Sequence, residues 1–222
     1  MKMRAIWASL MMTVLCCGSV WAWGLPSIAD AVKSATGGGR ATGNPDAFLA
    51  KAKKSEELVN KSAEQLFCLI ASKEEQAKAE EIQKKIDATT DSGEKMALQQ
   101  EKNSTVLAGV CKASADENLK AEARKWDDKK KKAAVDSLFN LALGGKMAAS
   151  LVPEGQALVK SIQANPLLLT KIGSLVEAIK SLGGIGVGTA KVISAVPPVF
   201  SAAKIDVKLP SSSTETPKDI EI

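Results

Sequence analysis

The pattern of hydrophobic and polar residues predicts a long amphipathic helix from Asn44 to Asp87. Asn44 is a favourable N-cap residue, Pro45 suits the first helical position, and no glycine or further proline occurs before Asp87. Apolar residues recur at helical spacing and form one stripe, which consists of Phe48, Ala52, Val59, Ala63, Leu66, Ile70 and Ala77. We expect this stripe to pack on the apolar C-terminal part of the chain.

A second long helix is predicted from Ser92 to the glycine pair Gly144-Gly145, which is typical of a helix C-terminus. Asp91 suits the N-cap position, and Glu94 three residues later completes a capping box. Only a short connection at residues 88–90 separates the two helices. They must therefore fold back on one another as an antiparallel hairpin over residues 44–143.

Two cysteines, Cys68 and Cys111, are equally far in sequence from the predicted turn. In an antiparallel hairpin such residues lie at the same height, so we expect an interhelix disulfide that stabilises the fold by about 4 kcal/mol. A redox-active pair is the less favoured reading because no Cys-x-x-Cys motif is present, and free or intermolecular thiols are a further alternative. A break of the first helix near Ser72 would move Cys68 out of level with Cys111.

Charge density falls sharply after the predicted hairpin. The chain has 18 basic and 17 acidic residues between Pro45 and Lys132, but 6 basic and 3 acidic residues between Ala133 and Ile205. Residues 144–205 therefore form an apolar region, which we expect to be a cluster of short helices interrupted at Gly183-Gly184. Such a region can be buried in the protein itself, in a partner or in a membrane.

One of these short helices is amphipathic and runs from Asn165 to Leu182. Its apolar face is a candidate lipid contact and carries Leu168, Ile172, Leu175, Ile179 and Leu182. The glycine-rich residues 183–191 that follow do not have the spacing of a phosphate-binding loop, and no strand precedes them. We therefore expect no nucleotide.

The two ends of the chain are predicted to lie outside the helical fold. Residues 1–22 have two positive charges, an apolar run and a small-residue cleavage site, which is the layout of a cleaved secretory signal peptide. This layout predicts export to a periplasm or the cell exterior, where thiols tend to oxidise. Residues 23–43 are an N-terminal segment with a glycine-rich linker, and residues 206–222 are predicted to be a disordered tail.

Composition disfavours most enzyme classes. The 222 residues include no histidine and no tyrosine, which removes the commonest general base and the commonest metal ligand. We expect no cofactor, and an enzyme would need carboxylate or lysine chemistry in a deep pocket with an acidic side chain. The net charge of +5 is small and becomes +3 without the two signal-peptide cations. Since aromatic rings are also scarce, we expect no nucleic acid partner.

The most basic stretch of the chain surrounds Trp126. It is a candidate contact for phosphates, lipid headgroups or polyanionic glycans, and its basic side chains are Arg124, Lys125, Lys129, Lys130, Lys131 and Lys132. The favoured alternative is a solvated helix face with Trp126 turned inward.

These patterns predict an all-α protein in which a long antiparallel hairpin, stapled by one disulfide, packs on a cluster of short apolar helices. The function that fits best is a non-enzymatic exported scaffold or adaptor for a protein partner that remains unidentified. The alternative is a membrane-active or lipid-binding protein that uses the apolar C-terminal helices. An enzyme without histidine is the third hypothesis.

Overall fold

The computed structural model describes residues 44–163 and 170–220, and within those ranges every regular element is a helix. The all-α prediction is confirmed. The predicted signal peptide (residues 1–22), the segment 23–43 and Leu168 lie outside the described residues. The helices are α2 Pro45–Ile70, α3 Lys73–Ala88, α4 Ser92–Ser114, α5 Glu117–Ala123, α6 Asp128–Gln163, α7 Ile172–Ala195 and α8 Pro197–Ala202.

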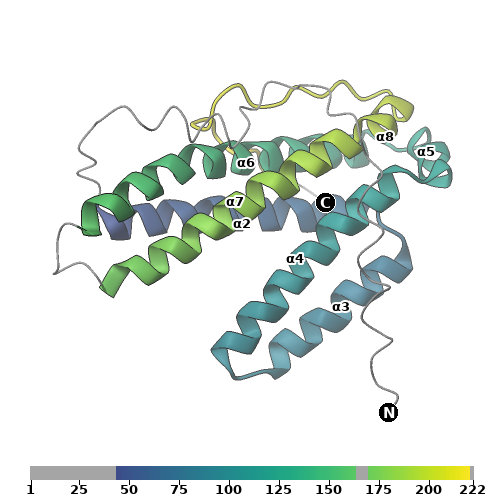
Figure 1. Cartoon of the computed structure of the whole chain (residues 1–222). Coiled ribbons are helices and arrows are strands. Elements are labelled where there is room, and N and C mark those ends of the chain that lie inside the picture. The colour runs from purple at the N-terminus through teal and green to yellow at the C-terminus, as the bar shows by residue number, and fades with distance from the viewer. Residues whose placement is uncertain (1–43, 164–169, 221–222) are drawn as a thin grey trace, which may run out of the picture.

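Helices α2, α6 and α7 pack together as the body of the molecule (Figure 1). Helix α6 runs antiparallel to α2, because Phe48 near the start of α2 lies against Gly155 while Val59, further along α2, lies against Gly144. The stripe predicted on the first helix makes this contact, and all its members except Ala77 are buried. The expectation that the stripe packs on the apolar C-terminal region is therefore correct.

The prediction that Gly144-Gly145 ends a helix is wrong, because α6 continues through both residues for a total of 36 residues. A Cβ at Gly144 would lie 2.5 Å from Val59 Cγ2, and a Cβ at Gly145 would lie 2.6 Å from Thr189 Cγ2. The two glycines thus let α6 approach α2 on one side and α7 on the other. Nor does Gly183-Gly184 interrupt α7, which is 24 residues long, so the C-terminal region is not a cluster of short helices.

The first long helix of the predicted hairpin breaks at Ala71 and Ser72, which lie between the end of α2 at Ile70 and the start of α3 at Lys73. Ser72 is the N-cap of α3, and its side chain accepts a hydrogen bond from the Glu75 N–H at 3.3 Å. The antiparallel hairpin consequently consists of α3 and α4 alone. Figure 1 shows these two helices projecting away from the body. We refer to residues 73–114 as the arm.

The second long helix of the prediction is divided into α4, α5 and α6. Asp116 caps α5 by accepting a hydrogen bond from the Asn118 N–H at 2.8 Å, and Asp127 accepts one from the Lys130 N–H at 2.7 Å in the first turn of α6. An aspartate side chain readily accepts hydrogen bonds from the free backbone N–H groups at the start of a helix. This explains why each break in the predicted helix lies beside an aspartate.

Cys68 and Cys111 form no disulfide, so the stapled hairpin predicted from their spacing is wrong. The prediction required one helix through Cys68 to run antiparallel to α4. Instead α2 and α4 run in the same direction, since Glu64 pairs with Lys102 at 2.6 Å and Phe67, further along α2, lies under Gly109. Because Phe67 faces α4, the next residue is rotated about 100° around the helix, and Cys68 is exposed.

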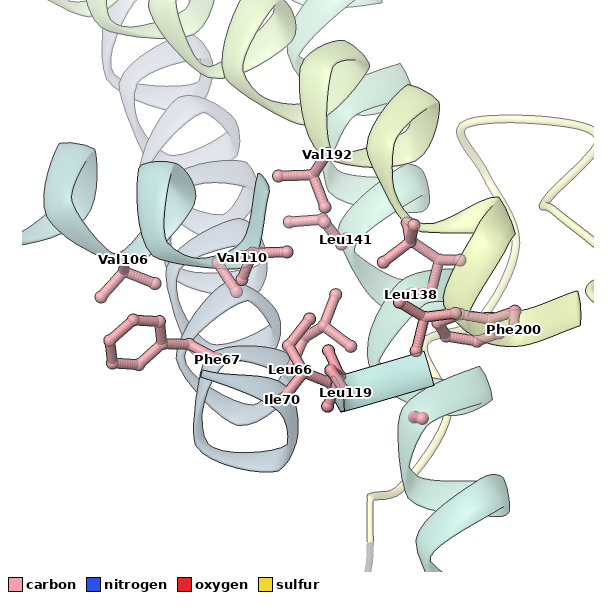
Figure 2. Close-up of a cluster of buried hydrophobic side chains, with 14 of the residues drawn as sticks. Leu66, Phe67, Ile70, Val106, Val110, Leu119, Leu138, Leu141, Val192 and Phe200 are labelled. Carbon is pink, nitrogen blue, oxygen red and sulfur yellow. The ribbon is translucent and has the colours of Figure 1, made fainter. Parts of the chain in front are cut away.

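A continuous hydrophobic cluster joins the base of the arm to the body (Figure 2). Phe67 and Leu66 of α2 meet Val110 of α4, and the cluster continues through Leu141 of α6 to Val192 of α7. The short helices α5 and α8 close one end of it with Leu119 and Phe200. The arm is therefore anchored at its base in the same core that holds the body together.

The C-terminal residues do not form the predicted disordered tail over the part that the structure describes. Residues 205–220 contain no helix and run beside α6 (Figure 1). The partly buried side chains alternate along the first part of this segment and pack on the hydrophobic cluster; they are Ile205, Val207 and Leu209. Alternation of this kind is typical of an extended chain with one face on a core.

Candidate interaction surfaces

The arm is held together by ion pairs as well as by apolar contacts. Glu75 of α3 accepts hydrogen bonds from Lys112 of α4 at 2.7 Å and from Lys78 at 3.1 Å. Nearer the tip, Lys102 donates to Gln83 at 2.7 Å. The inner apolar residues are small in number, with Ala79, Ile82 and Ile86 buried on α3.

The ion pair between Glu75 and Lys112 at the base of the arm shifts the pKa values of both residues. Hydrogen bonds from Lys112 and Lys78 hold the pKa of the Glu75 carboxyl below its ordinary value, and the bond to Glu75 raises the pKa of Lys112. A carboxyl with a depressed pKa stabilises the fold above its ordinary pKa, and that contribution is lost as the pH falls through the depressed value. The arm is thus electrostatically stabilised at neutral pH.

The tip of the arm is exposed and has a defined geometry. Asp91 caps α4 by accepting a hydrogen bond from the Glu94 N–H at 2.7 Å, as the sequence predicts. The Glu94 carboxylate, however, accepts from the Thr89 hydroxyl at 2.7 Å and so fixes the turn. Beside this turn Met96 is 55% exposed. Met96 and Val187, which is 46% exposed, are the large apolar residues that are most exposed in the described ranges.

The Cys68 thiol has the features of an unreactive surface cysteine. Partial desolvation of the sulfur, together with the negative charge of Glu64, raises the pKa of Cys68 above its ordinary value. Redox-active cysteines depend on the opposite shift, because the thiolate is the nucleophile.

We expect iodoacetamide to alkylate Cys68 in the native protein. The pH at which the alkylation rate is half-maximal should lie above the ordinary thiol pKa of about 8.5. The raised pKa leaves less thiolate at any given pH. Residue-resolved mass spectrometry over a pH series measures this rate, with Cys68→Ser as the control. A half-maximal rate below pH 8.5, or protection of Cys68 until a reductant is added, would contradict the structure.

The basic stretch around Trp126 does not form one face of a helix. Arg124 and Lys125 lie in the connection between α5 and α6, whereas the other four basic residues, Lys129 to Lys132, lie in the first turns of α6. Trp126 is 6% exposed and therefore buried, as the alternative interpretation expected. The Lys130 ammonium lies 4.9 Å from the centre of its ring, a cation–π contact.

The structure brings Arg124 together with two basic residues that the sequence analysis did not single out. Lys120 and Lys204 line the same open cleft between α5 and α8, which has a volume of about 450 Å³. Lys204 has a φ of 57°, a left-handed conformation that ends α8 and fixes where the next residues leave. No sequence signal marks this position, since glycine is the usual residue there.

The predicted lipid-contact residues of α7 divide into two groups. Leu175 and Leu182 are fully buried against Phe48 and its neighbours, and Ile172 and Ile179 are partly buried beside them. The opposite face of α7 is open, because a Cβ added at Gly173 or Gly184 would meet no atom within 4 Å.

By length and composition alone, the helical stretch Ile172–Ala202 could cross a membrane. An 18-residue window within this stretch has a mean hydropathy of 1.3, and 28% of that window is buried within the protein. A core helix of a soluble protein passes the same test.

No site with enzymatic geometry is evident in the part of the chain that the structure describes. There, no cluster of three or more histidine, cysteine or acidic side chains could hold a metal ion. A cavity between α2 and α7 is lined by Glu56 and Ser181, but its volume is about 160 Å³, which is below the ~300 Å³ at which ligand pockets usually begin.

Comparisons of this chain with protein-family models, with curated proteins and with solved structures find no match.

Proposed function

We propose that this chain is an exported, non-enzymatic helical protein that binds another protein through the tip of its arm. One observation carries the proposal: the arm projects from the body while its base is anchored in the core (Figures 1 and 2). A hairpin with this placement can contact a partner over several of its faces without rearrangement of the body.

The tip has the chemistry of a small interaction surface. Met96 offers a flexible apolar side chain, which suits variable protein contacts. Charged and polar residues surround it, since every residue from Asp91 to Ala97 is exposed. An apolar centre with a polar rim is the usual anatomy of a protein–protein interface.

The change Met96→Lys should reduce partner binding at least tenfold. Burying a methionine side chain is worth about 1.5–3 kcal/mol, and about 1.4 kcal/mol corresponds to a factor of ten in affinity. A photo-crosslinker placed at the neighbouring exposed residue Lys95, in the organism that makes the protein, reports the yield of one discrete protein adduct. The matched control is Val187→Lys, which removes the other exposed apolar side chain.

Equal adduct yields from Met96→Lys and the unmodified chain would overturn the proposal, as would the absence of any adduct from the tip. Far-UV circular dichroism of both variants is the folding control, and we expect it to show the helices retained because both substituted positions face solvent.

A second candidate function is contact with a lipid surface through the outer face of α7. Val187 is exposed on that face, and the cleft that contains Lys120, Arg124 and Lys204 lies against α8, which follows α7 directly. Glu117 also lines this cleft and pairs with Lys120 at 2.7 Å, which leaves Arg124 and Lys204 as its cations without an acidic partner among the described residues. Apolar surface beside basic side chains is a combination that binds anionic membranes. Under this alternative, Val187→Lys would abolish flotation of the protein with anionic liposomes and Met96→Lys would leave it unchanged.

A further inference from the structure

The end of the C-terminal segment, residues 211–220, is held on α6 by a side chain that binds its backbone. Asn140 is 3% exposed, and both ends of its carboxamide contact Lys218. Asn140 Nδ2 donates to the Lys218 carbonyl at 2.7 Å, and Asn140 Oδ1 accepts from the Lys218 N–H at 2.8 Å. Two residues of an antiparallel sheet exchange the same pair of bonds. Asn140 therefore recognises an extended backbone whatever side chains it carries.

Phe139 and Asp136 of α6, next to Asn140, contact the side chain of Lys218. The Lys218 ammonium lies 4.4 Å from the centre of the Phe139 ring and 3.5 Å from Asp136, whose side chain is 8% exposed. The Asp136 carboxylate also pairs with Lys132 at 2.8 Å, so Lys218 is its second cation. Phe139 and Asp136 together form a binding position for the Lys218 ammonium.

The other end of this surface binds the start of the segment. Lys146 donates a hydrogen bond from Nζ to the Ser211 carbonyl at 3.1 Å. The Glu215 carboxylate accepts hydrogen bonds from the backbone N–H groups of Ser211 and Ser212, which folds residues 211–215 into a turn. The bond from the Ser212 N–H, then that from the Ser211 hydroxyl, and last that from the Ser211 N–H lower the pKa of Glu215.

Residues 211–220 can leave this surface without opening the core. The apolar side chains that anchor the C-terminal part of the chain, Ile205, Val207 and Leu209, all precede the segment. Its named contacts to α6 are polar or cation–π contacts. Their loss would leave the buried Asn140 carboxamide without its two hydrogen bonds to Lys218, whereas Asp136 would keep its pair with Lys132. The vacated surface would therefore favour a replacement backbone with the same two groups.

We propose that the surface formed by Asp136, Phe139, Asn140 and Lys146 is a binding site for a lysine-bearing peptide whose backbone is extended at the lysine. Residues 211–220 of the same chain occupy it, and the same segment of a second copy can replace them. The attached segment has an effective concentration in the millimolar range for a short connection. A separate peptide therefore binds well only after the attached segment is released.

The test uses the full chain with Lys218→Pro, which removes both the N–H that Asn140 accepts and the ammonium beside Asp136. A fluorescent peptide with the sequence of residues 211–220 is added, and its anisotropy is measured. We expect the peptide to bind the variant at least ten times more tightly than the unmodified protein. The same peptide with the Lys218→Pro change should bind neither protein.

The double variant Asn140→Leu with Lys218→Pro should no longer bind the peptide. The change Asn140→Asp on the same Lys218→Pro background retains the acceptor but not the Nδ2 donor, and it should weaken peptide binding. The proposal is overturned if the peptide does not bind the single variant, or if removing Asn140 does not change its affinity. Hydrogen exchange supplies an independent readout: the amides of Thr216, Asp219 and Ile220 should exchange faster in Lys218→Pro while those of α2 keep their rates. Unchanged exchange at these three amides would equally overturn the proposal.

Discussion

Replacing Leu175 with alanine should lower the free energy of unfolding by about 2–5 kcal/mol. Leu175 is fully buried where α7 meets α2 and α6, in the cluster that contains Phe48 and Leu158. The truncation removes apolar contacts and leaves a cavity that the neighbouring helices can fill only in part. Urea denaturation followed by circular dichroism at 222 nm measures the change.

This result distinguishes a core residue from a lipid contact. The control Val187→Ala lies on the same helix but is 46% exposed, and a surface change of this kind should alter stability by less than about 0.5 kcal/mol. If Leu175 instead contacted lipid, both variants would have the stability of the unmodified protein in solution. Equal midpoints for the two variants would therefore contradict the packing of α7 described above.

The change Gly144→Ala should destabilise the protein by about 1–3 kcal/mol, the usual cost of overpacking a core. The added Cβ would lie 2.5 Å from Val59 Cγ2 and 3.3 Å from two backbone atoms of α2, the Ser55 carbonyl oxygen and the Val59 nitrogen. Backbone atoms cannot move aside as a flexible side chain can. Helix α6 would have to shift away from α2, and the Ser55 hydroxyl, which donates to the Gly144 carbonyl at 2.9 Å, would lose its partner.

The matched substitution Gly184→Ala should have the opposite effect. Gly184 is also inside a helix, but a Cβ there meets no atom within 4 Å. Alanine is the better helix former, so a gain of about 0.5–1 kcal/mol is expected. Thermal and urea denaturation of both variants give the comparison. Two changes of the same sign would show that helix propensity, and not the approach of α6 to α2, decides the effect at Gly144.

The local signals of helix starts could be predicted from the sequence. Asn44 caps α2, where its Oδ1 accepts from the Asp46 N–H at 2.9 Å, and Asp91 caps α4. The apolar stripe on α2 and its burial against the C-terminal region also follow from the sequence. These features depend on residues within a few positions of each other, or on helical periodicity, which a single chain displays directly.

The break between α2 and α3 also had a sequence signal. Ser72 followed by Glu75 has the spacing of a capping box, and Ser72 caps α3 in the structure. The absence of glycine and proline suggested continuity, but a helix can end wherever a good cap and a tertiary contact favour a new direction. The disulfide prediction depended on that continuity, since the equal height of Cys68 and Cys111 holds only for an unbroken antiparallel pair.

At the glycine pairs the error is the opposite one, because helices predicted to end there continue. The sequence pattern predicts helix ends at Gly144-Gly145 and Gly183-Gly184, but all four residues lie within helices. A glycine can end a helix through its backbone conformation, or it can lie inside one where another helix comes close. Only the position of Val59, in a helix distant in sequence, distinguishes these roles at Gly144. The Asn140 site could not be predicted from the sequence for the same reason, because Asn140 and Lys218 are 78 positions apart in the chain.

Helix α4 has a mechanical consequence for anything that binds at the arm. It is one uninterrupted helix of 23 residues, and at about 1.5 Å per residue it is roughly 34 Å long. Its first turns lie at the exposed tip, while Val106 and Val110 are embedded in the core. The arm is therefore a rigid element and not a flexible one. A force applied at Met96 is transmitted along α4 to the contact between Gly109 and Phe67, so it acts directly on the packing of the body.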